Sequence, residues 1–448
     1  MKNKLFYLIT MSLAISLSSN NKSSEHILDD IAPIESPFKM PQLKRPLFQN
    51  NTIYINKTGA KMNKLSTSAI QEAIDKLFKK GGGIVIVPSG KWLTGRIELK
   101  SNINLKLEEG AELQFSGEIK DYLPVVPTRN EGVDVISLGA MIYANGAENI
   151  ALTGKGKLIA PSRDCELMKY AKGAIEEELQ DIPIEKRIYD GSNGNKIFLP
   201  QFFGPINCKN ILVEGVTFEQ SLFWNIVPVY CENIIIRNVE VNSFGLGRTD
   251  GIDIDSSKNA LIENTTLDCG DDAFTLKAGR GKDGKLKGFP TENVVIRNCT
   301  VIRGVGGIAI GSETAAMIRN VYMHDCVLKY PRSGFLFKTR RPRGGGGENM
   351  WFERIHIMYT RGSAIVWDML GSSTFVGQLA KRFPAQPVNE LTPIYRNMHF
   401  KDITIDDCKM LIEAKGLPES PLENITFENI KSENRAMELQ DVGKISFK

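Results

Sequence analysis

The stretches CENIIIRNVEV (231–241), SKNALIENTTL (257–267) and TENVVIRNCTV (291–301) place one phrase at three successive points of the chain. In each stretch the second residue is charged and the third is asparagine, and apolar residues then alternate with polar ones. Alternation of this kind is typical of a strand with one buried face. The phrase therefore predicts a repeated structural unit.

Further copies of the phrase occur between residues 101 and 432, and most of the later intervals are 23 to 34 residues, the period of a solenoid. One turn of a coil cannot bury its apolar face alone, so stacked turns share a core, with strands about 4.8 Å apart. Asparagine fits the turn before each strand, because it tolerates left-handed backbone and can bond to its counterpart on the next turn. The repeated asparagines are Asn102, Asn149, Asn210, Asn233, Asn259, Asn293, Asn320, Asn349, Asn397 and Asn424.

The predicted fold class is all-β, a single-stranded right-handed parallel β-helix that occupies residues 46–448 as one domain. A helix within STSAIQEAIDKLFKKGGG (66–83) would cover its open end, with Ser66 as the N-cap and Gly81 after the last turn. Its apolar face would consist of Ala69, Ile70, Ala73, Ile74, Leu77 and Phe78. Long departures from the repeat at about 161–205 and 371–393 predict loops over one face of the coil.

The N-terminus has the pattern of a secretory signal peptide over residues 1–20. Two lysines precede the apolar run LFYLITMSLAISL (5–17), and small polar residues follow it. The run is too short to span a bilayer, and a buried first strand or helix is the alternative. With a polar lead-in segment at 21–45, the pattern predicts a periplasmic or secreted protein without membrane insertion.

Composition excludes several classes of function. The net charge of +4 is small and both signs are mixed along the chain, which argues against nucleic-acid binding. The seven cysteines show no zinc-ligand spacing and the chain has only four histidines, so no metal and no cofactor are predicted. The oligomeric state is left open.

Polar clusters mark consecutive coils at GRTDGIDIDSS (247–257), CGDDAFTLKAG (269–279), GVGGIAIGSE (304–313) and GFLFKTRRPRGGGG (334–347). Alternation places the large apolar residues of each cluster inward and sets two outward rows. One predicted row is Asp253, Thr275, Ala309 and Leu336, and the next is Asp255, Lys277, Gly311 and Lys338.

This register brings Asp250, Asp271 and Asp272 within about one strand spacing of one another. Carboxyl groups so close repel, so at least one should keep its proton to raised pH. A carboxylic acid beside a carboxylate is what inverting glycoside hydrolysis requires. Turn capping or a structural calcium site is the alternative. A cross-strand ion pair is an equal alternative to substrate binding for Asp255 and Lys277.

The order of these motifs resembles glycoside hydrolase family 28, the polygalacturonases and their relatives, over about residues 50–430. The family's N-T-D motif stands here as Arg248-Thr249-Asp250, and its G-D-D motif as Gly270-Asp271-Asp272. The resemblance implies that Asp271 is the general acid and that Asp250 and Asp272 hold the attacking water. It also implies an inverting, metal-independent hydrolase acting on galacturonate-containing pectic oligo- or polysaccharides. The first excursion and the glycine-rich third motif favour an exo-acting member.

Two departures from the family concern the leaving-group side of the cleft. Val305 or Gly306 replaces the histidine of the G-H-G motif, and Leu336 replaces the arginine of the R-I-K motif, whose lysine is Lys338. Without these two cations a neutral neighbour such as rhamnose is predicted there, while Lys338 would bind a galacturonate carboxylate on the glycone side. A solvated surface lysine is the alternative for Lys338. The run Arg340, Arg341 and Arg343 could restore the lost charge, and Asp253 and Lys277 are further candidate substrate contacts.

Three other functions remain open from the sequence. A rhamnogalacturonan-type hydrolase would belong to the same family, and a calcium-dependent pectic lyase would share the β-helix but form an unsaturated product. A non-catalytic glycan-binding β-helix is compatible with the lost histidine and arginine, although the intact Gly270-Asp271-Asp272 motif argues against it.

Overall fold

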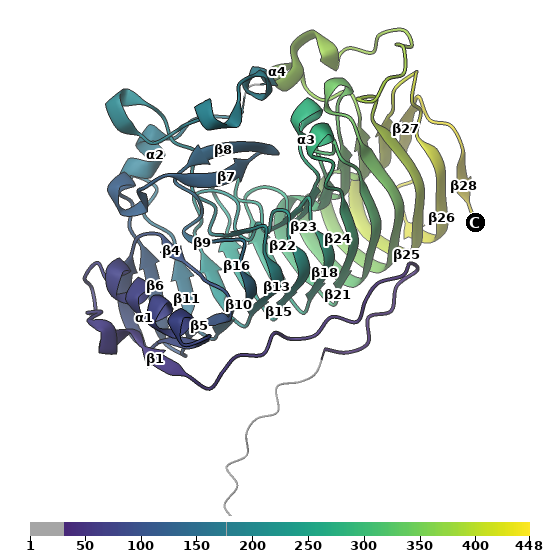
Figure 1. Ribbon diagram of the computed structural model, residues 1–448. Helices are drawn as coiled ribbons and strands as arrows, with labels where there is room; N and C mark the ends of the chain where they lie inside the picture. Colours follow the sequence, from purple (N-terminus) through teal and green to yellow (C-terminus); the bar gives the residue numbers. More distant parts are fainter. Residues whose placement is uncertain (1–30, 176) are drawn as a thin grey trace, which may run out of the picture. The chain divides into compact units, whose positions relative to one another are not determined.

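The computed structural model describes residues 31–175 and 177–448, so the signal peptide predicted at 1–20 lies outside the described residues. Residues Pro33–Lys448 form one compact unit. It is a right-handed parallel β-helix, as predicted (Figure 1). Its strands pair in parallel, apart from the antiparallel hairpin of β7 (Val126–Asn130) and β8 (Val133–Ser137).

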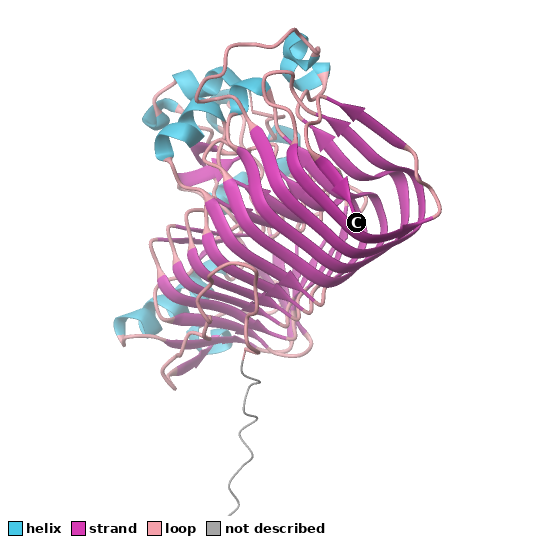
Figure 2. Cartoon of the chain, turned by 90° about the vertical axis from the view of Figure 1, so that its right-hand side faces the viewer, coloured by secondary structure: helices cyan, strands magenta, loops and turns pink. Residues whose placement is uncertain are grey.

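The stacked strands make three faces that run the length of the coil (Figure 2). The first face starts with β1 (Thr52–Tyr54), β2 (Gly83–Val87), β5 (Ile103–Leu107), β10 (Glu148–Gly154), β13 (Lys209–Glu214), β15 (Glu232–Arg237), β18 (Lys258–Glu263) and β21 (Thr291–Arg297). The second holds β3 (Gly90–Thr94), β6 (Ala111–Phe115), β11 (Lys157–Ile159), β14 (Thr217–Glu219), β16 (Glu240–Ser243) and β19 (Thr266–Cys269). The third holds β4 (Ile97–Glu98), β9 (Ile142–Asn145), β12 (Phe203–Ile206), β17 (Ile252–Asp255) and β20 (Phe274–Lys277).

Later strands are longer and bend from one face into the next (Figure 2). They are β22 (Thr300–Ile310), β23 (Ile318–Lys338), β24 (Gly346–Asp368), β25 (Ile394–Lys415) and β26 (Glu423–Ser432), with β27 (Met437–Gln440) and β28 (Ile445–Phe447) closing the stack. The apolar side chains of all the coils meet in one continuous core. Burial of that core supplies the main driving force for stacking.

Helix α1 (Thr67–Lys79) packs at the N-terminal end of the coil, where a cap was predicted. Ser66 occupies the N-cap position, but its hydroxyl bonds to the backbone oxygens of Lys61 and Lys64 instead of to the helix. Five of the six predicted apolar residues are buried. The exception is Phe78, which is 45% exposed because it lies at the edge of the apolar stripe, where the Lys100 ammonium covers its ring at 5.5 Å.

The repeated asparagines form the predicted ladder. All ten have left-handed backbone, with φ between 54° and 61°. From Asn102 to Asn320, and again from Asn349 to Asn424, each side-chain nitrogen donates to the side-chain oxygen on the preceding coil at 2.7 to 3.2 Å. The ladder therefore joins neighbouring coils and fixes the turn before each strand.

Replacing Asn259 with alanine is expected to lower the free energy of unfolding by about 1–3 kcal/mol. Left-handed backbone costs more free energy for alanine than for asparagine. The substitution also removes two ladder hydrogen bonds, the one donated to Asn233 at 3.2 Å and the one accepted from Asn293 at 3.1 Å. Asn259→Gly also loses the two hydrogen bonds but adopts left-handed backbone without strain, so it should be more stable than Asn259→Ala. Equilibrium denaturation of the three proteins measures both parts, and equal stability of the alanine and glycine variants would contradict the backbone contribution.

The strand register confirms the first outward row predicted around the acidic clusters and the first pair of the second row. Asp253 pairs with Thr275, which pairs with Ala309, and Ala309 pairs with Leu336 on the following coil. Asp255 and Lys277 are likewise register partners. Equivalent positions of four consecutive coils thus lie side by side on the third face.

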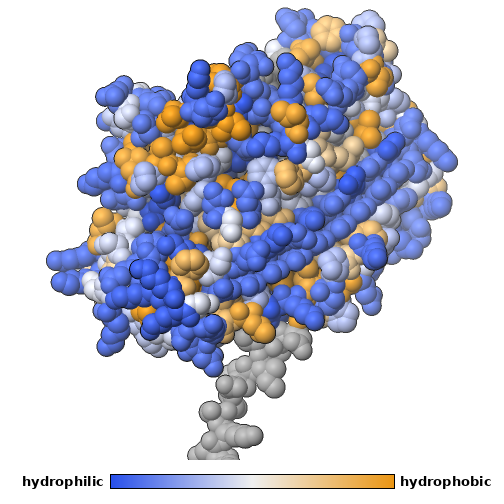
Figure 3. Space-filling model, in the orientation of Figure 1, coloured by the Kyte–Doolittle hydropathy of each residue, from blue (hydrophilic) through white to orange (hydrophobic). Residues whose placement is uncertain are grey.

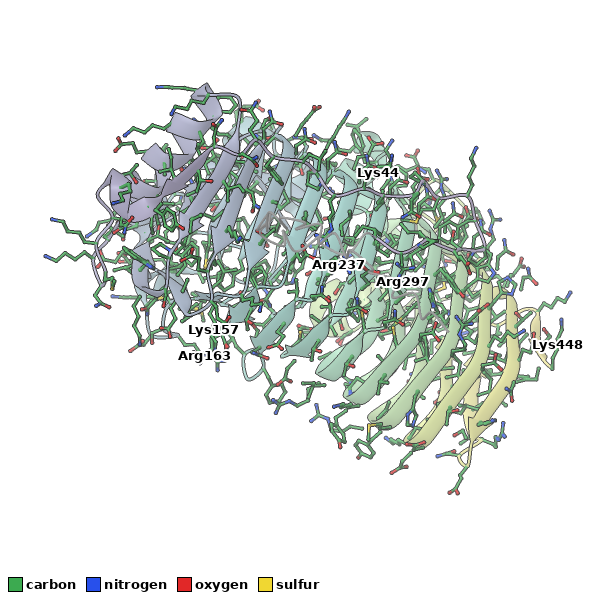
Figure 4. All side chains as sticks on the ribbon, turned by 90° about the horizontal axis from the view of Figure 1, so that it is seen from below. Lys44, Lys157, Arg163, Arg237, Arg297 and Lys448 are labelled. Atoms are coloured by element: carbon green, nitrogen blue, oxygen red, sulfur yellow. The ribbon has the colours of Figure 1, made fainter. Side chains whose placement is uncertain are left out.

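Residues 33–50, which include part of the predicted lead-in, run along the outward side of the first face (Figure 4). The guanidinium of Arg45 pairs with Glu214 at 2.7 Å, and Arg297 donates to the backbone oxygen of Pro33 at 2.8 Å. Phe38 packs beside Trp351, with ring centroids 5.9 Å apart. Elsewhere the outward strand surface carries diagonal rows of hydrophilic residues (Figure 3).

The two predicted excursions, the β7–β8 hairpin and the helix that follows β20 lie on one side of the coil (Figure 1). They contain the short helices α2 (Glu166–Tyr170), α3 (Gly281–Lys287) and α4 (Ser373–Val376). Among the described residues, no helix combines the length and the apolar character needed to cross a bilayer. These segments cover the face on which the acidic clusters emerge.

Candidate active site

The acidic clusters line a cavity of about 650 Å³ between the third face of the coil and the segments above it. Its floor comes from the coils, through Asp250, Asp271, Asp272, Lys277 and Lys338. Glu131 from the β7–β8 turn, with Ile175 and Glu178 from the first excursion, forms the wall. Residues more than 200 positions apart in the chain therefore share one cavity.

The coil places three carboxyl groups together at the starts of two adjacent strands. Asp250 precedes β17, and Asp271 and Asp272 precede β20 on the next coil. The backbone of the two turns is joined, since Gly251 N donates to Asp272 O at 3.0 Å. All three carboxyl groups line the cavity, so the proximity predicted from alternation is present.

Thr249 and Gly270 fix the two turns that carry these aspartates. Thr249 Oγ1 accepts a hydrogen bond from Gly270 N at 3.0 Å and has the backbone oxygens of Ser243 and Leu246 within 2.7 Å. A Cβ at position 270 would lie 1.9 Å from Leu246 O, so only glycine fits there. This packing explains why a threonine precedes Asp250 and a glycine precedes Asp271.

Asp272 is held rigidly. Its Oδ2 is 2.6 Å from the Lys338 ammonium, and its Oδ1 accepts a hydrogen bond from Gly306 N at 2.9 Å. A Cβ at position 306 would lie 3.0 Å from Asp272 Oδ1, so a histidine there would crowd this carboxylate. Val305, the residue before Gly306, is half-buried and lines a second cavity.

Asp271 is less constrained and faces the cavity more openly than its neighbours. Its Oδ2 accepts a hydrogen bond from Arg248 N at 3.1 Å, and within the described chain its other oxygen makes no hydrogen bond. Burial, and then the negative charge of Asp272, raise the pKa of Asp271 above its usual value. The geometry presents a carboxyl group that keeps its proton longer than an ordinary aspartate.

Asp250 and Asp253 lie deeper than Asp271, with 3% and 0% of their surface exposed. Burial and the neighbouring Asp253 and Asp271 raise the pKa of Asp250 well above its usual value. Burial raises the pKa of Asp253 to about 8, although the Lys277 ammonium lies 3.7 Å from its Oδ1. Because Asp253 has no exposed surface and does not line the cavity, the contact with a sugar predicted for it would have to be indirect.

Lys277 lies at the centre of a buried charge network. Its ammonium is 3.2 Å from Glu313, 3.7 Å from Asp253 and 3.9 Å from Asp250, and it lies 4.4 Å from the centre of the Trp224 ring. Burial alone would lower the pKa of Lys277, but Glu313 and the aspartates together raise it. Lys277 therefore contacts one carboxylate with a lowered pKa, Glu313, and two aspartates with raised pKa values.

The cross-strand ion pair considered for Asp255 and Lys277 does not form. Asp255 instead pairs with Arg129, with Nη1 and Oδ1 3.4 Å apart, and with Ser256. Lys277 turns away because Glu313 offers a closer carboxylate at 3.2 Å. The two residues are neighbours in the strand register, but each forms its ion pair with a residue from another segment.

Glu131 belongs to the site although no motif in the sequence indicated it, and Glu313, the last residue of the third polar cluster, was not singled out there. Glu131 accepts hydrogen bonds from Arg248 at 2.5 Å, Arg280 at 3.2 Å and the backbone N–H of Ile175 at 3.1 Å, so it ties the hairpin turn to the excursion. Arg280 also pairs with Glu313 at 3.1 Å. Lys277, Arg343 and Arg280 outweigh the effect of burial and hold the pKa of Glu313 well below its usual value.

The three arginines that follow Lys338 lie in three different environments. Arg340 lines both the acidic cavity and the second cavity. Arg343 pairs with Glu313 at 2.7 Å at the end of the acidic cavity. Arg341 pairs with Glu419 at 2.6 Å and lines a different cavity from these two, so the substrate contact predicted for it stays a prediction.

No group of three histidine, cysteine or acidic side chains is arranged to hold a metal ion among the described residues. The acidic side chains of the cavity are matched instead by lysine and arginine.

Comparisons with known proteins agree on one family. A family model described as glycosyl hydrolases family 28 matches residues 188–370. The Vitis vinifera protein named "Probable polygalacturonase" is 26% identical over 376 residues, which cover 82% of this chain and 70% of that protein. An exo-poly-alpha-D-galacturonosidase of Dickeya chrysanthemi is 28% identical, over 67% of this chain and 54% of that protein.

A solved structure with the same fold is the hyperthermoactive exopolygalacturonase from Thermotoga maritima. It superposes with a TM-score of 0.80 and is 29% identical, over 91% of this chain and 92% of that chain. The matched region of the family model contains Asp250, Asp271, Asp272 and Lys338. The matched region thus contains the coils that carry the three aspartates.

Proposed function

Because this chain belongs to glycoside hydrolase family 28, we propose that it is an exo-acting galacturonan hydrolase that releases terminal galacturonate from pectic chains. The observation that carries the proposal is the meeting of Asp250, Asp271 and Asp272 in one walled cavity. The exo-acting relatives from Dickeya chrysanthemi and Thermotoga maritima support the same activity.

Exo action follows from the wall of the cavity. The β7–β8 turn and the first excursion close it through Glu131, Ile175 and Glu178, and Glu131 holds these two segments together. A cavity closed on this side accepts the end of a chain but not its middle. The terminal sugar would lie against this wall, with the scissile bond above the aspartates.

Cleavage would proceed with inversion in one displacement. Asp271 gives its proton to the glycosidic oxygen as the bond from that oxygen to the anomeric carbon breaks. Asp272 takes a proton from a water that Asp250 helps to hold, and the oxygen of this water bonds to the anomeric carbon from the opposite face. The raised pKa of Asp271 suits the acid role, and the Lys338 ammonium beside Asp272 suits the role of base.

The remaining predicted site residues divide into contact and positioning roles. Lys338 and Arg340 line the junction of the two cavities and would attract the carboxylate of the bound sugar. Lys277 and Asp253 would act through Asp250, because they lie below it and are buried. Metal independence stays a prediction that a chelator can test.

The neutral sugar predicted on the leaving-group side is not what the second cavity favours. The cavity contains Val305 and Leu336, as the lost family cations imply, but it is also lined by six basic side chains against two carboxylates. Such a surface attracts a polyanion. We therefore propose plain galacturonan as the substrate, in place of a galacturonate-capped, rhamnose-containing fragment.

Export completes the proposal. Pectic polymers lie outside the cell that degrades them, and residues 1–20 carry the pattern of a secretory signal peptide. The protein would then act in the periplasm or after secretion.

Digestion of a galacturonate pentamer is expected to yield galacturonic acid first, with the tetramer as its partner product. A walled cavity that holds one terminal sugar gives this pattern from the first turnover. NMR of the newly formed sugar should show the β anomer before mutarotation, because an inverting displacement turns an α bond into a β hydroxyl. Activity should be unchanged by a chelator.

Early release of dimers and trimers would contradict exo action. An unsaturated product with chelator sensitivity would identify a calcium-dependent lyase, and binding without any cleavage would identify a glycan-binding β-helix. Faster cleavage of galacturonate-capped, rhamnose-containing fragments than of the pentamer would restore the substrate predicted from the sequence.

A further inference from the structure

The second cavity adjoins the active site on the side of the later coils. It has a volume of about 750 Å³ and shares Lys338 and Arg340 with the acidic cavity. Its other lining residues come mainly from β23, β24 and β25, which follow one another along the coil. A chain whose end lies at the aspartates therefore has a continuous path into this space.

The lining of the second cavity is strongly cationic. Its basic side chains are Arg332, Lys338, Arg340, Arg361, Lys409 and Lys415, and its acidic ones are Asp368 and Glu413. Asp272 neutralises Lys338, and Glu413 neutralises Lys415 at 2.7 Å. Asp368 accepts hydrogen bonds from the backbone N–H groups of Leu370 and Gly371. The charge that remains is positive.

Three of these cations make no ion pair within residues 31–175 and 177–448: Arg332, Arg361 and Lys409. All three are exposed. Each lies at the bend of a successive strand, just ahead of Ser333 on β23, Gly362 on β24 and Met410 on β25. Neighbouring coils are about 4.8 Å apart, so the three charges form a row that leads away from the active site.

The floor beside this row is apolar and suits the face of a sugar ring. Leu336 and Val366 are register partners on adjacent coils, and Val305 lies on the coil before them. The row of cations thus begins on the coil after Val305, where the family histidine is absent. The positive charge lost at that position is supplied by the following coils.

We propose that the second cavity binds the part of a galacturonan chain beyond the scissile bond, with Arg332, Arg361 and Lys409 pairing with the carboxylates of successive sugars. Each galacturonate carries one carboxylate, so a chain that crosses successive coils meets successive cations. This assignment rests on the proposed function, because it takes the terminal sugar to lie at Asp271.

Titration calorimetry with a galacturonate pentamer tests the proposal. Its Kd is measured for the Asp271→Asn protein and for the same protein that also carries Arg332→Ala and Arg361→Ala. The double substitution is expected to raise Kd about tenfold, which corresponds to roughly 1.4 kcal/mol, the sum expected for two exposed ion pairs. In the otherwise unsubstituted enzyme, the same pair should lower kcat/KM on the pentamer by a similar factor. It should leave hydrolysis of an aryl α-galacturonide, whose leaving group is uncharged, within about twofold.

Arg396→Ala is the matched control. Arg396 is an exposed arginine of β25 that pairs with Glu348 outside both cavities, and its loss should change neither measurement. An unchanged pentamer Kd in the double variant, or an equal loss on the aryl galacturonide, would overturn the assignment. If the unsubstituted enzyme cleaved neither substrate but the double variant still bound the pentamer more weakly, the binding site would stand and the proposed hydrolase activity would fall.

Discussion

Asp271→Asn is expected to lower kcat on a galacturonate trimer by about 10²–10⁴-fold, the usual contribution of a positioned general acid. The amide keeps the size of the side chain and can still contact Arg248 N, 3.1 Å away in the native protein, but it has no proton to give to the leaving oxygen. Steady-state kinetics measure the loss, and circular dichroism checks that the fold is intact. Turnover close to that of the native enzyme would refute the role of Asp271.

The dependence of kcat on pH tests the acid role of Asp271 independently. Burial and Asp272 raise the pKa of Asp271, so its proton, and with it the native rate, is lost only as the pH rises through that raised value. The residual activity of Asp271→Asn should lack this alkaline limb. Asp268→Asn, which changes a nearby aspartate paired with Arg303 outside the cavity, should keep both the rate and the limb.

Lys277→Met is expected to lower the free energy of unfolding by about 3–5 kcal/mol, the cost of leaving buried charges without their partner. Lys277 is 3% exposed, and its ammonium is the cation shared by Glu313, Asp250 and Asp253. Methionine fills much of the space of the lysine stem but cannot neutralise these groups. Equilibrium unfolding in denaturant measures the change.

Lys338→Met provides the comparison for this substitution. The Lys338 side chain is 24% exposed and pairs with Asp272 alone, so water can replace part of its interaction and the loss should be smaller. A decrease of less than about 1 kcal/mol for Lys277→Met would mean that the buried carboxyl groups take up protons instead of remaining charged. That result would contradict the paired network as a stabilising feature.

Local patterns were sufficient to predict the coil and the grouping of the three aspartates. The side-chain alternation of a strand has a period of two residues, so Ile252, Asp253 and Ile254 reveal their faces without knowledge of any partner. Asparagine before each strand marks a left-handed turn for the same local reason, and φ values such as 57° at Asn259 bear this out. Once the repeat is recognised, residues at equivalent positions of successive turns must be neighbours.

The same reasoning could not find residues that reach the site from outside the repeat. Glu131 lies in a hairpin turn and Ile175 in the first excursion, where no period relates their positions to the coil. Arg332, Arg361 and Lys409 lie at strand bends, where the register shifts and alternation no longer tells which way a side chain points. Their proximity to the active site depends on how each coil bends.

By itself, the sequence determined the parallel β-helix, its helical cap and the adjacency of Asp250, Asp271 and Asp272, because a short-range period and the stacking of identical turns leave little other choice. The tertiary structure alone decided which charges meet. It paired Asp255 with Arg129 instead of Lys277, turned Arg341 toward Glu419, and made the second cavity cationic. Ion pairs form between whichever opposite charges come within a few ångströms after folding. In this protein those charges are supplied by the β7–β8 hairpin, by turns outside the repeat and by the bends of the later strands.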